Sequence, residues 1–131
     1  MIFVDTSFWI ALRYRDDSRH PAAARLWATA TRHLVTTNLV VGETWTLLRS
    51  RTAHEPALRF VDAVLASSRT RIVTVDSQLE REAWAWLRRH DERVHSFVDA
   101  TSFAVMRNEQ IHDAFAFDGD FAAAGFVELR P

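Results

Sequence analysis

The sequence predicts an α/β fold, a three-layer α/β/α sandwich with a mostly parallel central sheet. Short apolar segments of strand length alternate with longer segments whose apolar residues recur at helical spacing. This alternation is typical of parallel strands joined by helical crossovers. The strand-length segments are apolar throughout, as a sheet covered on both faces requires. A chain of 131 residues fits one domain over residues 1–131.

The elements follow from periodicity and from signals at their ends. Pro21 suits the first turn of a helix, and Ser77 and Glu80 have the spacing of a capping box. In chain order we expect a strand over residues 2–4, helices over 8–14 and 20–32, a strand over 34–37, helices over 39–51 and 56–66, a strand over 71–75, helices over 77–90 and 97–108, a strand over 114–117, a short helix over 121–124 and a last strand over 126–129.

The composition excludes several classes of protein. There is no cysteine, which rules out a disulfide framework, a Cys-ligated zinc and a thiol nucleophile. No apolar run is long enough to span a membrane, and the apolar start is too short for a signal peptide. We therefore expect a cytoplasmic protein with no membrane partner. The net charge of -1 gives no general attraction to nucleic acid, so any such site must be local.

Two aspartates follow directly on predicted strands. Asp5 ends the first apolar segment and Asp118 ends the segment over 114–117. In open parallel sheets, ligands bind beyond the carboxyl ends of the strands, so the two side chains can meet at one edge. A helix cap for Asp5 and a turn for Asp118 are the alternative readings.

Two further carboxylates lie on helices. Glu43 shares the apolar stripe of its helix with Leu39, Val40 and Leu47, and a buried carboxylate needs a cation or a raised pKa. An internal salt bridge to an arginine is the alternative. Asp99 stands three residues after Ser96 and could be only a capping residue, although Ser102, Phe103 and Met106 continue its helix face inward.

If these four carboxylates converge, their mutual repulsion requires a counter-charge. A divalent cation supplies it, and an oxygen-only ligand set without cysteine favours Mg²⁺ or Mn²⁺ over zinc.

Four segments resemble, in order, the acidic motifs of the PIN-domain ribonucleases, and of the bacterial VapC-type toxins in particular. They are residues 4–7, residues 37–43, residues 97–103, and residues 116–121 followed by Gly125-Phe126. Each motif is short, but their order at this spacing is more specific, and the resemblance covers essentially the whole chain. It implies a metal-dependent endoribonuclease whose catalytic residues are Asp5, Glu43, Asp99 and Asp118, the metal being held by Asp5, Asp99 and Asp118. Supporting roles are implied for Thr6, Ser7, Ser102 and Asp120.

The resemblance also implies the reaction and the partners. Water attacks the phosphodiester bond of an RNA substrate and leaves 5′-phosphate and 3′-hydroxyl ends. The cognate antitoxin protein lies in an apolar groove, and the protein is a homodimer. Candidate phosphate contacts are Arg13, Arg15, Arg49 and Arg51, with solvated helix ends as the simpler alternative. Trp9 and Trp45 are candidates for base stacking, but core packing is the favoured interpretation of both. Candidate groove residues are Phe8, Trp9, Leu12, Trp27, Trp45, Leu48 and Phe60, all of which could equally belong to the core.

Other functions fit the sequence less well. A phospho-receiver domain needs a lysine, and all sixteen basic residues are arginine. A haloacid-dehalogenase phosphatase needs Asp-x-Asp on the first strand, and a serine hydrolase needs Gly-x-Ser-x-Gly. The six histidines show no metal-binding spacing, and surface or loop positions suffice for them. A housekeeping RNA-processing nuclease of the same fold, or a non-catalytic module that binds RNA or protein, remains an alternative.

Overall fold

A computed structural model describes all 131 residues and shows an all-parallel five-stranded sheet in the order β3-β2-β1-β4-β5. The strands are β1 (Ile2–Val4), β2 (Leu34–Thr37), β3 (Thr70–Val73), β4 (Asp113–Phe115) and β5 (Val127–Glu128). The helices are α1 (Thr6–Arg13), α2 (His20–Thr29), α3 (Asn38–Arg51), α4 (His54–Ala66), α5 (Ser77–Arg89), α6 (Phe97–Asn108) and α7 (Asp120–Ala123). The predicted fold class is confirmed, and the sheet is parallel throughout.

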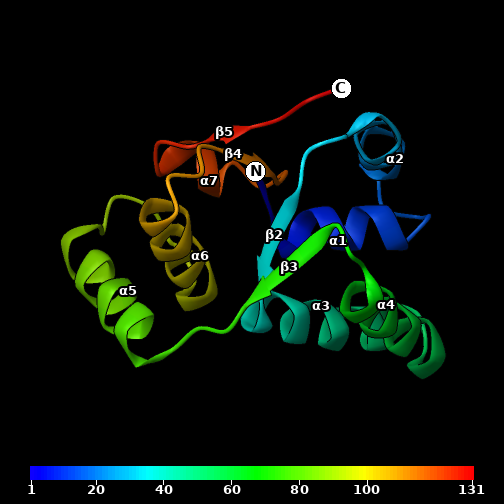
Figure 1. Cartoon of the computed structure of the whole chain (residues 1–131), viewed down its shortest axis with the longest axis horizontal. Coiled ribbons are helices and arrows are strands. Elements are labelled where there is room, and N and C mark those ends of the chain that lie inside the picture. The colour runs from blue at the N-terminus through cyan, green and yellow to red at the C-terminus, as the bar shows by residue number, and fades with distance from the viewer.

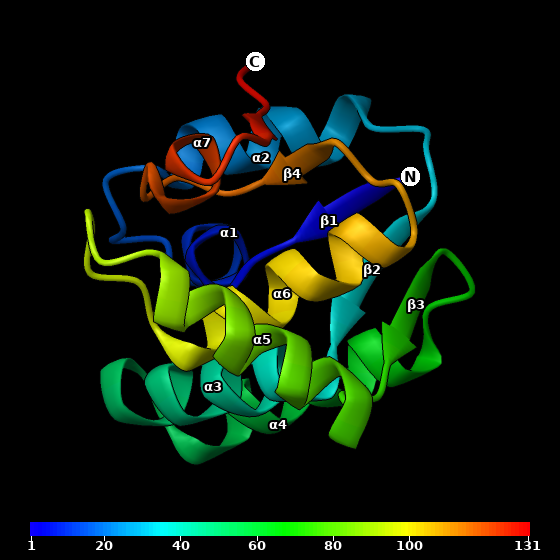
Figure 2. The ribbon, with the colours of Figure 1, turned by 90° about the vertical axis from the view of Figure 1, so that its left-hand side faces the viewer.

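Helices cover the sheet on both sides. In Figure 1, α5 and α6 lie on one side of the strands and α1, α2 and α4 on the other, while α3 continues from the end of β2. The view turned by 90° places α5 and α6 in front of β1 and β2 (Figure 2). None of these helices is long and apolar enough to cross a membrane.

Aromatic side chains fill the core on both faces of the sheet. On one face, Phe8 of α1 stacks on Phe115 of β4 with ring centroids 4.4 Å apart. On the other, Phe121 packs edge-on against Phe103 of α6 at 5.0 Å and stacks on Phe3 of β1 at 5.9 Å. All five side chains are fully buried. They fix the central strands between the helix layers, because aromatic side chains contribute large buried areas.

The strand order changes direction beside β1. From β1 the chain builds outward through β2 to β3, and it then returns to add β4 and β5 on the opposite side of β1. Such a reversal opens a crevice beyond the carboxyl ends of the two strands that flank it. Asp5 follows β1 directly and Asp118 follows β4 after two residues, so both lie at this crevice.

Several predicted boundaries differ by a few residues. The strand predicted over 71–75 is Thr70–Val73, because it pairs with β2 over its whole length and has no neighbour further on. The second helix ends at Thr29, three residues early. The capping box predicted at Ser77 is wrong: Asp76 is the N-cap of α5 and accepts the Leu79 N–H at 2.9 Å.

Candidate metal centre and active site

An open pocket of about 450 Å³ lies at the crevice. Its lining joins residues from α1, α3, α6 and α7 and from the loops that follow α1, α5 and β4. We call it the acidic pocket, because six carboxylates line it together with three basic side chains: Asp5, Asp17, Glu43, Asp99, Asp118 and Asp120, with Arg19, Arg51 and His95. The structure thus brings the four predicted acids Asp5, Glu43, Asp99 and Asp118 to one pocket.

Asp5 is the most buried of these acids, with 4% of its surface exposed. It is the N-cap of α1, and its Oδ2 accepts hydrogen bonds from the Ser7 N–H at 3.2 Å and the Ser7 hydroxyl at 2.8 Å. Burial raises the pKa of Asp5 to about 7, and the charges of Asp99 and Asp118 add to that rise against the lowering effect of Ser7. No arginine or histidine forms an ion pair with Asp5, so its charge lacks a protein partner.

Asp99 combines two roles. It completes a capping box at the start of α6: its Oδ2 accepts the Ser96 N–H at 3.0 Å, and its own N–H donates to the Ser96 hydroxyl at 2.9 Å. The pKa of Asp99 is nevertheless raised, chiefly by burial and also by the charge of Asp120. The capping interpretation is therefore correct, and it leaves Asp99 facing the other acids.

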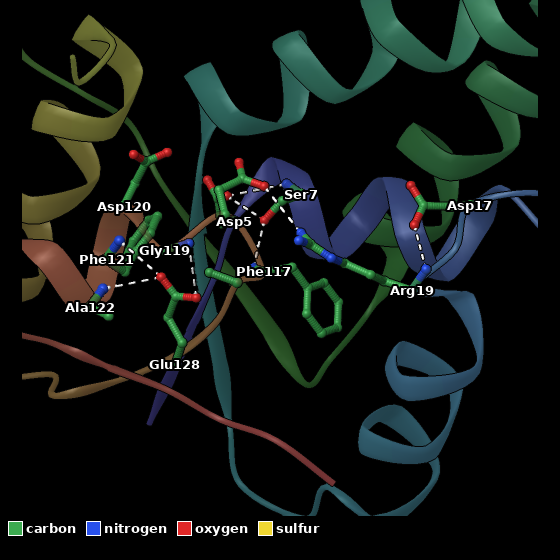
Figure 3. Close-up of polar contacts among 12 residues, drawn as sticks. Asp5, Ser7, Asp17, Arg19, Phe117, Gly119, Asp120, Phe121, Ala122 and Glu128 are labelled. Atoms are coloured by element: carbon green, nitrogen blue, oxygen red, sulfur yellow. Dashed lines mark hydrogen bonds and ion pairs between the residues drawn. The ribbon is translucent and has the colours of Figure 1, made fainter. Parts of the chain in front are cut away.

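Asp118 lies at the pocket rim, half-exposed, 3.6 Å from an Arg19 guanidinium nitrogen. Burial of its inner part, together with the charges of Asp120 and Asp99, raises its pKa, and Arg19 opposes this rise. The guanidinium of Arg19 lies 5.6 Å from the centre of the Phe117 ring. Figure 3 shows Arg19 reaching over that ring toward Asp5 and Ser7.

Glu43 lies on α3, half-buried, and lines the acidic pocket together with Leu47 and Arg51 at successive spacings of four residues. It forms no salt bridge with an arginine, so the internal ion pair considered for it is absent. A half-buried carboxylate beside other acids is thus left with a side chain free to contact water or a cation.

Ser7 and Thr6 contribute hydroxyls to the pocket. The Ser7 oxygen donates to Asp5 and accepts the N–H of Phe117 at 3.0 Å, which ties the segment after β1 to the segment after β4 (Figure 3). The Thr6 hydroxyl is buried and has no hydrogen-bond partner within the protein. Since buried polar groups are rarely left unpaired, this hydroxyl is an unsatisfied group in the wall of the pocket.

Glu128 of β5 holds the loop that carries Asp118 and Asp120. Its carboxylate accepts three backbone N–H groups, from Gly119 at 3.2 Å and from Phe121 and Ala122 at 3.1 Å each (Figure 3). Gly119 has a φ of 81°, a left-handed conformation that favours glycine. Glu128 was not predicted from the sequence, although a lone carboxylate in a predicted apolar strand was a signal.

The oxygen chemistry of the acidic pocket suits a hard divalent cation, although the ligand atoms of Asp5, Asp99 and Asp118 do not all lie within 4.8 Å of one another in this structure. Asp5, Asp99 and Asp118 supply carboxylate oxygens from one crevice, all three with raised pKa values. Burial and mutual repulsion are the causes, and a cation relieves both. Oxygen ligands of this kind suit Mg²⁺ or Mn²⁺.

A family model for the PIN domain matches residues 2–127. The chain belongs to the PIN-domain family. Relatives from two strains of Mycobacterium tuberculosis (CDC 1551 / Oshkosh and ATCC 25618 / H37Rv), both named 23S rRNA-specific endonuclease VapC20, are 57% identical over 131 residues, covering 100% of this chain and 99% of each relative.

A solved structure supports the same relationship. The crystal structure of Mycobacterium tuberculosis VapC20, described as a sarcin-ricin loop cleaving toxin, matches with a TM-score of 0.96 and 56% identity, covering 100% of both chains. The predicted resemblance to the PIN-domain family and its VapC-type toxins is confirmed.

Some predicted residues lie elsewhere in this PIN domain. Ser102 does not line the acidic pocket: it is buried, and its hydroxyl donates to the Val98 carbonyl at 3.0 Å. Of the four arginines suggested as phosphate contacts only Arg51 lines the pocket. Trp9 is buried against Trp27 and Phe60, as the favoured core-packing interpretation predicts, and is not available to stack on a base. The others that do not line the pocket are Arg13, Arg15, Arg49 and Trp45.

Three pocket residues of the PIN domain were missed by the sequence analysis. Asp17 and Arg19 come from the loop before α2, where neither periodicity nor a motif marks them. His95 was expected to be explained by a surface or loop position. The residue does lie in a loop, but only 3% of its side chain is exposed, and it lines the acidic pocket.

Proposed function

We propose that this PIN-domain protein is a Mg²⁺- or Mn²⁺-dependent endoribonuclease and the toxin of a toxin–antitoxin pair. The observation that carries the proposal is the convergence of Asp5, Glu43, Asp99 and Asp118 on one pocket in which Asp5 has no cationic partner. The full-length similarity to VapC20, a 23S rRNA-specific endonuclease, supports the choice of RNA as substrate.

The carboxylates and the Thr6 hydroxyl have different roles in the proposed reaction. Asp5, Asp99 and Asp118 would hold the metal, which when bound polarises water and neutralises charge on the phosphodiester. Glu43, which lines the same pocket without an ion-pair partner, would orient a ligating water or contact a metal. Thr6 offers the hydroxyl that lacks a protein partner.

Ser7 keeps Asp5 in position through its two hydrogen bonds. Asp120 is paired with Arg93 at 2.8 Å and supports the rim. Arg19 and Arg51 line the pocket and would contact the backbone phosphates, because the planar guanidinium fork matches phosphate oxygens. They supply the local positive charge that the net charge of the chain does not.

The proposed substrate is a structured 23S rRNA loop of the sarcin–ricin kind, on the strength of what the VapC20 relatives cleave. Cleavage of intact ribosomes or of purified 23S rRNA, mapped by primer extension, tests this. Cuts spread over many unrelated sites would contradict the assignment of a specific loop.

The proposed protein partner is a cognate antitoxin. An apolar pocket of about 390 Å³ between α1, α2 and α4 fits an apolar segment of such a partner, and three of the predicted groove residues line it: Trp9, Leu12 and Trp27. Phe8, Leu48 and Phe60 belong instead to the fully buried core. A homodimer is also proposed, and light scattering of the purified protein tests it. A toxin with a cytoplasmic antitoxin and a ribosomal substrate acts in the cytoplasm.

The decisive experiment is RNA cleavage with defined metals. Wild-type protein is expected to cut in Mg²⁺ or Mn²⁺, to stop in EDTA, and to leave 5′-phosphate and 3′-hydroxyl ends. Asp5→Asn and Asp99→Asn should abolish cleavage, while Asp62→Asn, on the exposed surface of α4, should cut normally. Full activity in EDTA, or 2′,3′-cyclic phosphate ends, would refute the mechanism.

Two other functions are separated by simpler measurements. A housekeeping nuclease of the same fold would not arrest growth when expressed, whereas a toxin arrests growth and Asp5→Asn restores it. A non-catalytic module would bind RNA with no cleavage in any metal. The carboxylates of the acidic pocket that have no cationic partner favour a catalytic protein over a module that only binds RNA or protein.

A further inference from the structure

His95 is an unusual residue of the acidic pocket. It lies in the loop between α5 and α6, with its ring edge-on to Trp86 at 5.1 Å and to Phe103 at 5.4 Å. Only 3% of the side chain is exposed, and its Nδ1 is buried without any hydrogen-bond partner in the protein. An unpaired polar atom in such a position costs about 1–3 kcal/mol, so a ligand at this nitrogen would remove a penalty.

The His95 ring lies beside two carboxylates. His95, Asp99 and Asp120 each offer one ligand atom, and these three atoms lie within 4.8 Å of one another. Donors around one divalent ion are separated by about 3–4 Å, because ligand distances are about 2.1 Å. Small rotations of partly buried side chains would therefore bring the set onto one ion.

An ordinary ion pair does not explain this arrangement. The Nδ1 of His95 is 3.8 Å from Oδ1 of Asp120, which is too long for a hydrogen bond. Arg93 donates to that same oxygen at 2.8 Å, so the carboxylate already has a cationic partner. One oxygen of Asp120 and one of Asp99 make no hydrogen bond within the protein.

We propose that His95, Asp99 and Asp120 form a second cation position of this chain, selective for Mn²⁺ and similar first-row transition ions over Mg²⁺. Imidazole is a good ligand for such ions, whereas Mg²⁺ prefers oxygen. The position shares Asp99 with the centre formed by Asp5 and Asp118. Any role in cleavage rests on the proposed nuclease function, but metal binding at this position does not.

The direct test is pulsed EPR on the full-length protein with MnCl₂. Wild-type protein is expected to show coupling between Mn²⁺ and a ¹⁴N nucleus, and ¹⁵N-labelled histidine should change that coupling to a ¹⁵N pattern. This measurement needs no mutation, so it does not depend on whether a variant folds. Bound Mn²⁺ with no histidine nitrogen coupling would overturn the proposal.

A matched pair of variants adds an affinity measurement. His95→Phe keeps an aromatic ring against Trp86 and Phe103 but removes the ligand. The control is His90→Phe, because His90 also stacks on Trp86, at 4.2 Å, yet bonds to Glu92 and does not line the pocket. Circular dichroism and thermal melting check that both variants are folded.

The expected result is a loss of metal selectivity. Calorimetric titration of His95→Phe should show Mn²⁺ affinity reduced by at least about tenfold, the lower end of the effect of groups that merely support a ligand. Mg²⁺ affinity should stay within about twofold, as expected for an all-oxygen site. His90→Phe should match wild type for both ions. An equal change for the two ions in His95→Phe, or none, would overturn the proposal.

The two proposals fail in different ways. If Asp5→Asn loses Mg²⁺ binding and RNA is cleaved, but no histidine nitrogen couples to Mn²⁺, only the second position is wrong. If the nitrogen coupling is present and RNA is cleaved in neither metal, the second position stands and the nuclease function is wrong.

Discussion

Substituting Asn for Asp5 should stabilise the metal-free protein in a way that depends strongly on pH. Asp5 is buried, 4% exposed, and its only hydrogen-bond donors are the N–H and hydroxyl of Ser7. An Asn side-chain oxygen can accept both bonds, so the substitution preserves the cap of α1. What it removes is the ionisable proton and the negative charge.

The magnitude follows from the pKa of Asp5, which burial first and then the charges of Asp99 and Asp118 raise from 3.8 to about 7. At about 1.36 kcal/mol per pKa unit, ionising this carboxyl in the folded state costs about 4 kcal/mol more than in the unfolded chain. Well below pH 3.8 the group is protonated in both states and the cost is absent. Between pH 4 and 7 the folded protein holds a proton that the unfolded chain has lost, so stability falls as pH rises.

The assay is urea unfolding of wild type and Asp5→Asn at pH 4 and pH 8, with EDTA present. The gain in unfolding free energy on substitution should be about 3–4 kcal/mol larger at pH 8 than at pH 4. Any pH-independent cost of the amide cancels in this difference. In a separate measurement at pH 8 without EDTA, Mg²⁺ at 100 times its dissociation constant should stabilise wild type by about 2.7 kcal/mol and should leave Asp5→Asn unchanged.

A matched control is Asp76→Asn. Asp76 caps α5 as Asp5 caps α1, but it is exposed. Asn and Asp are similar as caps, so this variant should show little pH-dependent difference. If Asp5→Asn changed the unfolding free energy equally at both pH values, the burial of a strained charge at Asp5 would be refuted, and with it the need for a cation there.

Three further substitutions test the support of the site. Glu128→Gln should lower the unfolding free energy by about 1–2 kcal/mol and the kcat of RNA cleavage by about tenfold or more. The reason is that the substitution weakens the hydrogen bonds that fix the loop of Asp118. The control, Glu55→Gln on the exposed surface of α4, should change neither quantity. Arg51→Ala should raise KM about fivefold, equivalent to about 1 kcal/mol, with kcat little changed, and Arg49→Ala should leave both constants alone. Thr6→Val should keep or increase the melting temperature, because the buried hydroxyl has no protein partner, yet reduce kcat; a large loss of stability would show that the hydroxyl is bonded.

The sequence predicted the acids because their positions follow from local rules. Asp5 and Asp118 come after apolar strands, and parallel strands end at a shared edge. Asp99 is part of a capping box, and the N-terminus of α6 lies at that same edge. Each of these positions is fixed by its own element together with a single topological assumption.

The wrong site predictions on α3 and α6 concern residues that lie on the wrong face or the wrong turn of their helix. Ser102 was grouped with Asp99 because it lies on the same inward face, but it is almost a full turn further from the N-terminus of α6 and therefore packs below the pocket. Arg51 and Arg49 were grouped as neighbours in sequence. Glu43, Leu47 and Arg51 are spaced by four residues and share one helix face, whereas Arg49 falls on another. Spacing alone could have separated the two arginines.

Other residues depend on contacts that no local pattern encodes. Arg19 reaches the acidic pocket over the ring of Phe117, almost a hundred residues away in the chain. His95 is buried because Trp86 and Phe103, from two different helices, close around its loop. Glu128 interacts with α7 only because the last strand adds to β4. These contacts require the tertiary fold itself.

Two carboxylates of the acidic pocket, Asp5 and Asp99, are held by backbone donors instead of cations, whereas Asp118 and Asp120 have arginine partners. The N–H of Ser7 holds Asp5 and that of Ser96 holds Asp99, both at helix N-termini, where the helix dipole favours negative charge. If this support outweighed burial and repulsion, the pKa values of Asp5 and Asp99 would be lowered, yet both are raised. The caps therefore fix the geometry without neutralising the charge. Such a balance keeps the acids in place for a divalent ion and leaves the ion as the group that completes the electrostatics of the site.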